Sequence, residues 1–83
     1  MDDTTRRIDL HLELAGEEEL NELERALLKA RATELGEIRR RDIRLTAGYG
    51  DATTRDVLDD EGRRARIRHD ALTRVIDALR AAR

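Results

Sequence analysis

The first regular pattern in the chain lies at residues 5–14, which read TRRIDLHLEL. From position 8 onward every second residue is leucine or isoleucine, and Asp9, His11 and Glu13 lie between them. Successive side chains of a strand point to opposite faces, so this alternation predicts a β-strand with one buried and one solvated face. His11 between two carboxylates has the neighbours of an acid–base group or a metal ligand. A solvated strand face has the same composition, and we favour that interpretation.

The next segment predicts an amphipathic helix from Glu17 to about Leu35. Three glutamates open it where the helix dipole favours negative charge, and Gly36 is expected to end it. One apolar stripe at helical spacing carries Leu20, Leu23, Leu27 and Ala30. Leu28 and Leu35 lie beside it, with Glu24 and Arg31 between the two rows. Glu24 and Arg31 then flank a single buried stripe, or else Leu28, Ala32 and Leu35 form a second apolar edge that meets a partner chain.

Three further strands are predicted over residues 36–48, 53–58 and 63–68. One face of the strand over residues 36–48 carries Ile43, Leu45 and Ala47. In the strand over residues 63–68, Ala65 and Ile67 alternate with arginines. Turns rich in glycine and aspartate are expected between the strands at Gly48-Tyr49-Gly50-Asp51 and at residues 59–62.

The C-terminal segment predicts a second helix with Asp70 as its N-cap. Its apolar stripe carries Leu72, Val75, Ile76 and Leu79. The element order is then β-α-β-β-β-α in a single domain, residues 1–83. We expect an α+β two-layer sandwich, in which two helices pack on one face of a mixed four-stranded sheet.

The composition restricts the chemistry that the chain can perform. Seventeen basic and 19 acidic residues give a net charge of −2, so bulk charge favours neither a nucleic acid nor a membrane as partner. The chain has no serine and no cysteine, which excludes serine and cysteine nucleophiles. We expect no enzyme, no cofactor and no metal site. No signal peptide or transmembrane segment is recognisable, so we expect a soluble protein that is cytoplasmic if expressed in a cell.

Two arginine-rich segments, residues 39–44 and 63–68, could follow a phosphate backbone, although no aromatic side chains accompany them. A weak nucleic-acid binder is therefore one alternative function. A small protein-interaction module of natural origin, such as one that forms a homodimer, is another. The residues expected to carry an interaction in these alternatives are Leu28, Arg31, Leu35, Arg44, Arg64, Arg66 and Arg68.

The alternating run at residues 5–14, the glycines Gly16 and Gly36, and the stripe over residues 72–79 resemble computationally designed two-layer α/β mini-proteins. The residue alphabet is also narrow, because proline, serine, glutamine, phenylalanine, tryptophan and cysteine are all absent. The resemblance, or a simplified-alphabet origin, implies an artificial and stable scaffold with no natural biochemical function and no required partner.

Overall fold

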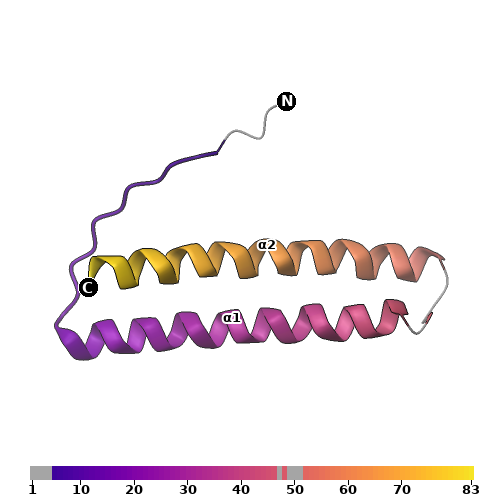
Figure 1. Cartoon of the computed structure of the whole chain (residues 1–83), viewed down its shortest axis with the longest axis horizontal. Coiled ribbons are helices and arrows are strands. Elements are labelled where there is room, and N and C mark those ends of the chain that lie inside the picture. The colour runs from indigo at the N-terminus through magenta and orange to yellow at the C-terminus, as the bar shows by residue number, and fades with distance from the viewer. Residues whose placement is uncertain (1–4, 47, 49–51) are drawn as a thin grey trace.

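A computed structural model of the chain describes residues 5–46, 48 and 52–83. Two long helices dominate that part: α1 spans Glu17–Thr46 and α2 spans Ala52–Ala82. They lie side by side and antiparallel, so the start of α1 is next to the end of α2 (Figure 1). The fold is a helical hairpin preceded by an N-terminal segment outside the helices.

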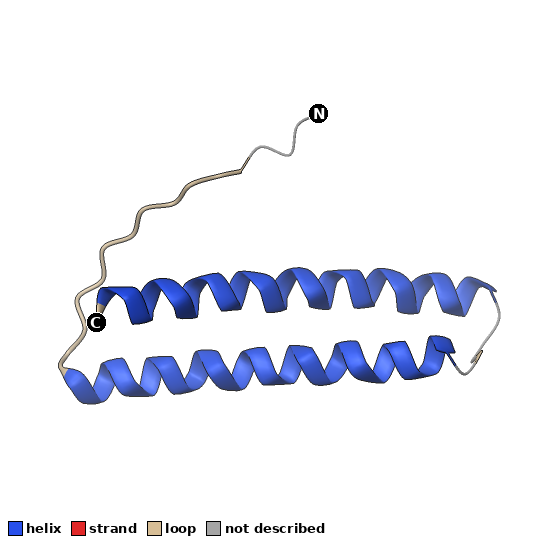
Figure 2. Cartoon of the chain, in the orientation of Figure 1, coloured by secondary structure: helices blue, strands red, loops and turns tan. Residues whose placement is uncertain are grey.

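The predicted α+β sandwich and its four-stranded sheet are wrong. The described residues contain helix, turn and loop but no strand (Figure 2). Residues 36–46 continue α1, and residues 53–68 belong to α2 together with the turn expected within them. Asp70 lies inside α2 and is not its N-cap. Of the turn predicted at residues 48–51, only Gly48 is described, and it is a turn residue with φ of +73°. Tyr49, Gly50 and Asp51, like Ala47 in the predicted strand, fall outside the described residues.

A seven-residue repeat explains why α2 is one continuous helix. Leu58, Ala65, Leu72 and Leu79 are spaced seven apart, and Gly62, His69 and Ile76 follow the first three by four residues. This 3-4 spacing keeps one face of a helix against its neighbour. Ala65 and Ile76 are fully buried, whereas Ile67 is 53% exposed. A strand would have placed Ala65 and Ile67 on the same face, so their alternation is a short coincidence within a helical repeat.

The face of α1 that meets α2 has the same spacing, but half of its residues are charged. It carries Leu20, Glu24, Leu27, Arg31, Glu34, Ile38, Arg41 and Leu45, all of them half-buried. Ion pairs join it to α2, among them Arg68 Nε to Glu34 Oε2 at 3.0 Å and Arg41 Nε to Glu61 Oε1 at 3.5 Å. The charged members obscure the repeat in the sequence, because an apolar stripe is the signal that periodicity arguments use.

Neither Gly36 nor Gly62 ends a helix, although both were expected outside helical structure. Glycine inside a helix costs about 1 kcal/mol relative to alanine, so flanking residues must offset it. A Cβ on Gly62 would lie 3.9 Å from Cδ of Arg41, which shows how closely that side chain crosses the buried glycine. The predicted start of α1 at Glu17, with its acidic first turn, is confirmed.

The hydrophobic core of the hairpin is small. Among the described residues only Leu58, Ala65 and Ile76 are buried apolar side chains. The radius of gyration is 16.7 Å, against about 12 Å for a compact domain of this length. Two helices alone cannot surround a core, so much apolar surface is left for other contacts.

Candidate interaction surface

The segment of residues 5–14, here called the arm, joins the hairpin through Ala15 and Gly16. Gly16 has φ of +112°, a conformation that side-chain-bearing residues rarely adopt. The Glu19 carboxylate accepts a hydrogen bond from the Ala15 N–H at 2.6 Å, and the Gly16 carbonyl accepts one from the Leu20 N–H at 3.2 Å. These bonds start the helix and set the direction in which the arm leaves it.

The arm runs as an extended loop and not as part of a sheet (Figure 2). Within the described part of the chain, no backbone–backbone hydrogen bond joins it to another segment. Ile8, Leu10 and Leu12 are 69%, 75% and 68% exposed, and Leu14 is half-buried. The predicted strand is therefore wrong as part of an intramolecular sheet, because no second strand lies beside it among the described residues.

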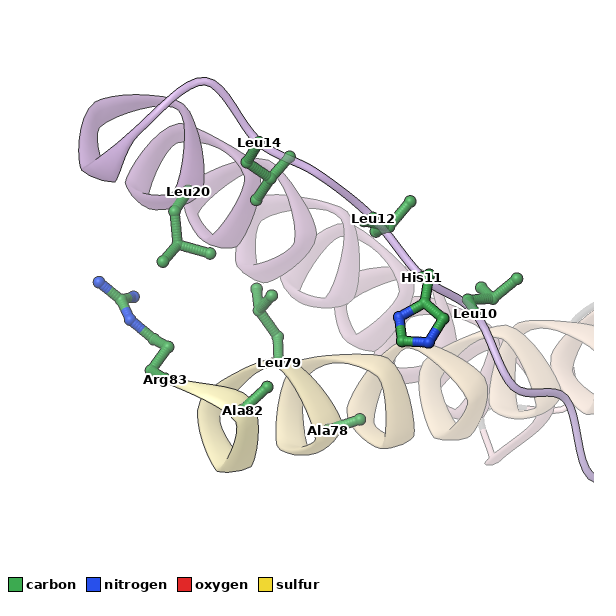
Figure 3. Close-up of a pocket in the computed structure, with 9 residues that line it drawn as sticks. All are labelled: Leu10, His11, Leu12, Leu14, Leu20, Ala78, Leu79, Ala82 and Arg83. Carbon is green, nitrogen blue, oxygen red and sulfur yellow. The ribbon is translucent and has the colours of Figure 1, made fainter.

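A hollow of about 460 Å³ separates the arm from the helix ends. Its walls come from three elements: Leu10, His11, Leu12 and Leu14 of the arm, Leu20 of α1, and Ala78, Leu79, Ala82 and Arg83 at the end of the chain (Figure 3). In Figure 3 the His11 ring points from the arm toward α2. Most of the lining is aliphatic, which suits an apolar occupant better than a polar one.

Sequence reasoning missed the α2 side of this hollow. Outside the face that meets α1, small apolar residues follow one flank of the helix at positions 71, 75, 78 and 82, which are Ala71, Val75, Ala78 and Ala82. All four are exposed. Their spacing of four, three and four residues is a helical signal, but it is visible only if the helix is extended to include them as a second stripe.

Charged and polar groups join the ends of the two helices beside the hollow. This end cluster consists of Glu17, Asn21, Glu24, Arg80 and Arg83. Glu24 accepts from Arg80 Nε at 2.9 Å and also pairs with Arg83. The hydrogen bond from Arg80, supported by Arg83 and by the positive charge of both, lowers the pKa of Glu24 below its ordinary value of 4.5. The cluster holds the last residue of the chain against the first turns of α1.

The arginines predicted to form a basic surface are dispersed over the hairpin. Residues 64, 66 and 68 would share one face of a strand, but on α2 a step of two residues turns by about 200°, so Arg66 lies on the opposite side of the helix from Arg64 and Arg68. Arg64 pairs with Asp60 at 3.2 Å, Arg66 with Asp42 at 2.9 Å, and Arg68 with Glu34 at 3.0 Å. Arg44 is exposed near the end of α1. The described residues therefore give no arginine-rich strand.

The other predicted contact residues lie along α1. Leu28 and Leu35 are half-buried at the edge of the face that meets α2. Arg31 belongs to that face and donates to Thr73 Oγ1 of α2 at 3.4 Å. The structure does not bring these residues together with the arm or with the arginines of α2, so they do not form one surface.

The described residues contain neither a cluster of metal ligands nor a helix that could cross a membrane. Over residues 5–46, 48 and 52–83, no group of three or more His, Cys, Asp and Glu side chains is placed to hold a metal ion. In the same residues, neither helix combines the length and the apolar character needed to cross a membrane.

Comparison with family models, with curated proteins and with solved structures finds no match for the chain.

Proposed function

We propose that the chain is a small self-association module, and that the arm carries the contact. The observation behind this proposal is the exposed aliphatic row of the arm, Ile8, Leu10 and Leu12, on an extended segment without a strand partner among the described residues. Exposed apolar groups that gather on one surface are typical of interaction sites. A free extended segment also offers a row of backbone donors and acceptors to another strand.

The hairpin supports an intermolecular role for the arm. Among the described residues, the backbone is tied to α1 only at the base of the arm, through Ala15 and Glu19. Leu10 and Leu12 border the hollow (Figure 3) but stay 75% and 68% exposed. The aliphatic row therefore gains little from its own helices. Burying one such side chain contributes about 1.5–3 kcal/mol, so contact with another molecule would stabilise the protein substantially.

Sedimentation or light scattering over a dilution series tests the proposal. We expect the intact chain to have the mass of a dimer at high concentration and to dissociate on dilution. Replacing Leu12 by glutamate should shift the chain to the monomer, because a charge in an apolar contact is costly. The matched control is Ile43→Glu, since Ile43 is also 68% exposed but lies near the far end of α1.

Circular dichroism of both variants shows whether the hairpin is still folded. A variant that is monomeric because it has unfolded is then not mistaken for one that has lost only the contact between copies. A wild-type chain that stays monomeric at high concentration contradicts the proposal. So does a dimer that Ile43→Glu disrupts as strongly as Leu12→Glu.

Two other interpretations stay predictions. Nucleic-acid binding has less support than self-association, because Arg64, Arg66 and Arg68 are each paired with a carboxylate. The absence of a natural function, implied by the resemblance to designed mini-proteins, is compatible with self-association, although the α/β part of that resemblance is wrong.

A further inference from the structure

We infer that two copies pair through their arms as an antiparallel two-stranded ribbon, with Leu10 of one copy opposite Leu10 of the other. This inference rests on the proposed self-association and names its surface and register. The observation behind it is that the charges on the polar face of the arm are complementary to those of a second arm that runs antiparallel to it. That face reads Arg7, Asp9, His11 and Glu13.

The register centred on Leu10 opposes residues that lie equally far before and after it. Arg7 then faces Glu13 of the second copy, and Asp9 faces His11 of the second copy. Two-fold symmetry repeats both contacts, as expected for an isologous dimer interface. Opposite charges that face each other across strands are stabilising, and like charges are destabilising.

The same register matches the apolar face. Ile8 lies opposite Leu12 of the second copy, so the aliphatic side chains of both arms gather on one face of the ribbon. Opposed residues of an antiparallel pair share a face, and a slip of one residue in one strand would mix apolar with charged side chains. The alternation of the arm therefore restricts the pairing to registers centred on a residue.

Antiparallel registers centred on neighbouring residues are less favourable, because they oppose like charges, lose apolar pairs or reach the base of the arm. A centre at residue 9 sets Asp9 against Asp9, and a centre at residue 11 sets Asp9 against Glu13. A centre at residue 8 shortens the apolar face, because Leu10 then lies opposite Arg6. A centre at residue 12 keeps Leu10, Leu12 and Leu14 paired but sets Ile8 against Gly16, whose φ of +112° ends the extended backbone of the arm. Parallel pairing in register opposes every charge to its own copy.

The hairpin supplies what a ribbon needs to be stable. A two-stranded ribbon alone is marginal in water and needs an apolar surface to pack on. The exposed flank of α2, with Ala78 and Ala82, borders the hollow beneath the arm, and Leu10 and Leu12 of the arm line the same hollow. Within the described residues, no ion pair or hydrogen bond engages the charged side chains on the polar face of the arm, so they are available to a second arm.

Disulfide cross-linking tests the register directly, because the chain has no cysteine of its own. Leu10→Cys should form a covalent dimer on mild oxidation, since opposed Cα atoms lie within disulfide range. Leu12→Cys is the matched control, because in this register the two copies of position 12 are about 13 Å apart along the ribbon. A mixture of Ile8→Cys and Leu12→Cys chains should form the covalent heterodimer.

Charge reversal tests the complementarity. Arg7→Glu and Glu13→Arg should each weaken the homodimer at least about tenfold, because each opposes like charges twice. An equimolar mixture of the two variants should restore dimerisation. In the mixed dimer, position 7 of the Arg7→Glu chain faces position 13 of the Glu13→Arg chain with opposite charge. At the other end of the ribbon, the unchanged Glu13 of the first chain faces the unchanged Arg7 of the second. Parallel arms would not be weakened by either single variant, because like charges already face each other in that arrangement.

The outcomes separate this inference from the function on which it rests. A monomeric wild type overturns both. A dimer in which Leu12→Cys cross-links as readily as Leu10→Cys, or in which the charge-reversed chains do not rescue each other, overturns the arm register and leaves self-association standing.

Discussion

At the scale of single residues, backbone conformation distinguishes the glycines. Gly16 has a positive φ at the junction between the arm and α1, whereas Gly36 and Gly62 lie inside helices. A Cβ on Gly36 would have only the Arg40 guanidinium nearby, at 3.8 Å, and on Gly62 the nearest atom would be the Arg66 guanidinium at 3.6 Å. Both distances are ordinary van der Waals contacts, so a Cβ would fit at either position without a clash.

We therefore expect Gly36→Ala and Gly62→Ala each to raise the free energy of unfolding by about 0.5–1 kcal/mol. Gly16→Ala should lower it by about 1–2 kcal/mol, because alanine is strained at that φ although the space around it is open. Urea denaturation monitored by far-ultraviolet circular dichroism measures all three. A destabilising Gly36→Ala would contradict the prediction.

Glu34 is a second residue whose exchange should stabilise the hairpin. Its Oε2 pairs with Arg68, but its buried Oε1 has no hydrogen-bond partner among the described residues. A buried polar atom without a partner is costly. Removing the carboxylate leaves no buried charge unpaired, because its partner Arg68 is 52% exposed and stays solvated. We expect Glu34→Leu to raise the free energy of unfolding by about 1 kcal/mol.

Glu22→Leu is the matched control for that exchange. Glu22 also forms an arginine pair at 3.0 Å, with Arg25, but its side chain is 62% exposed. We expect a change within about 0.5 kcal/mol at this position. If Glu22→Leu were as stabilising as Glu34→Leu, general hydrophobicity and not the unpaired oxygen would explain both.

At the scale of the elements, electrostatic contacts fasten α1 to α2 where apolar burial is small. The end cluster around Glu24 is the densest of these contacts, and Arg66 with Asp42 joins the helices nearer the turn. Each exposed pair contributes little by itself. The partly enclosed Glu24, with two arginines, is the residue from which we expect a measurable effect.

The lowered pKa of Glu24 makes the hairpin sensitive to acid. Because the pKa is lower in the folded than in the unfolded chain, ionised Glu24 stabilises the fold at pH values above about 4.5. That contribution is lost as the pH falls below about 4.5 and through the folded pKa. Glu24→Gln should be less stable than wild type at neutral pH and should lose less stability on acidification.

Denaturation curves at about pH 7 and about pH 3, on either side of the titration, measure this difference. Glu37, whose pKa is also lowered, mainly by a hydrogen bond from Arg40, is present in both proteins and so does not affect the comparison. Equal pH dependence for wild type and Glu24→Gln would contradict the role of Glu24.

At the scale of the whole molecule, the three buried apolar side chains of the described residues are few for a chain of 83 residues. A core of this size supports only marginal stability, so association and folding should be coupled. We expect the Tm to rise by several degrees between about 5 and about 500 µM protein. Leu12→Glu should have a Tm that does not change with concentration. A wild-type Tm that stays constant over the same range would argue against coupling.

The sequence by itself determined the local features. The glutamates at the start of α1 and the 3.6-residue stripe that includes Leu72 and Ile76 indicate helix wherever they are placed. The alternation of the arm is a property of residues 5–14 alone, and it indicates which of their side chains share a face in an extended chain.

Only the tertiary structure decided that residues 36–46 and 52–68 are helical. Short runs such as Ala65 to Ile67 fit both periods, and the glycines at positions 36 and 62 favour a break. Contacts across the hairpin decide between the two, because Arg68 meets Glu34 and Arg41 crosses Gly62 only when both segments are helices. Such partners lie far apart in the chain, so local periodicity carries no information about them.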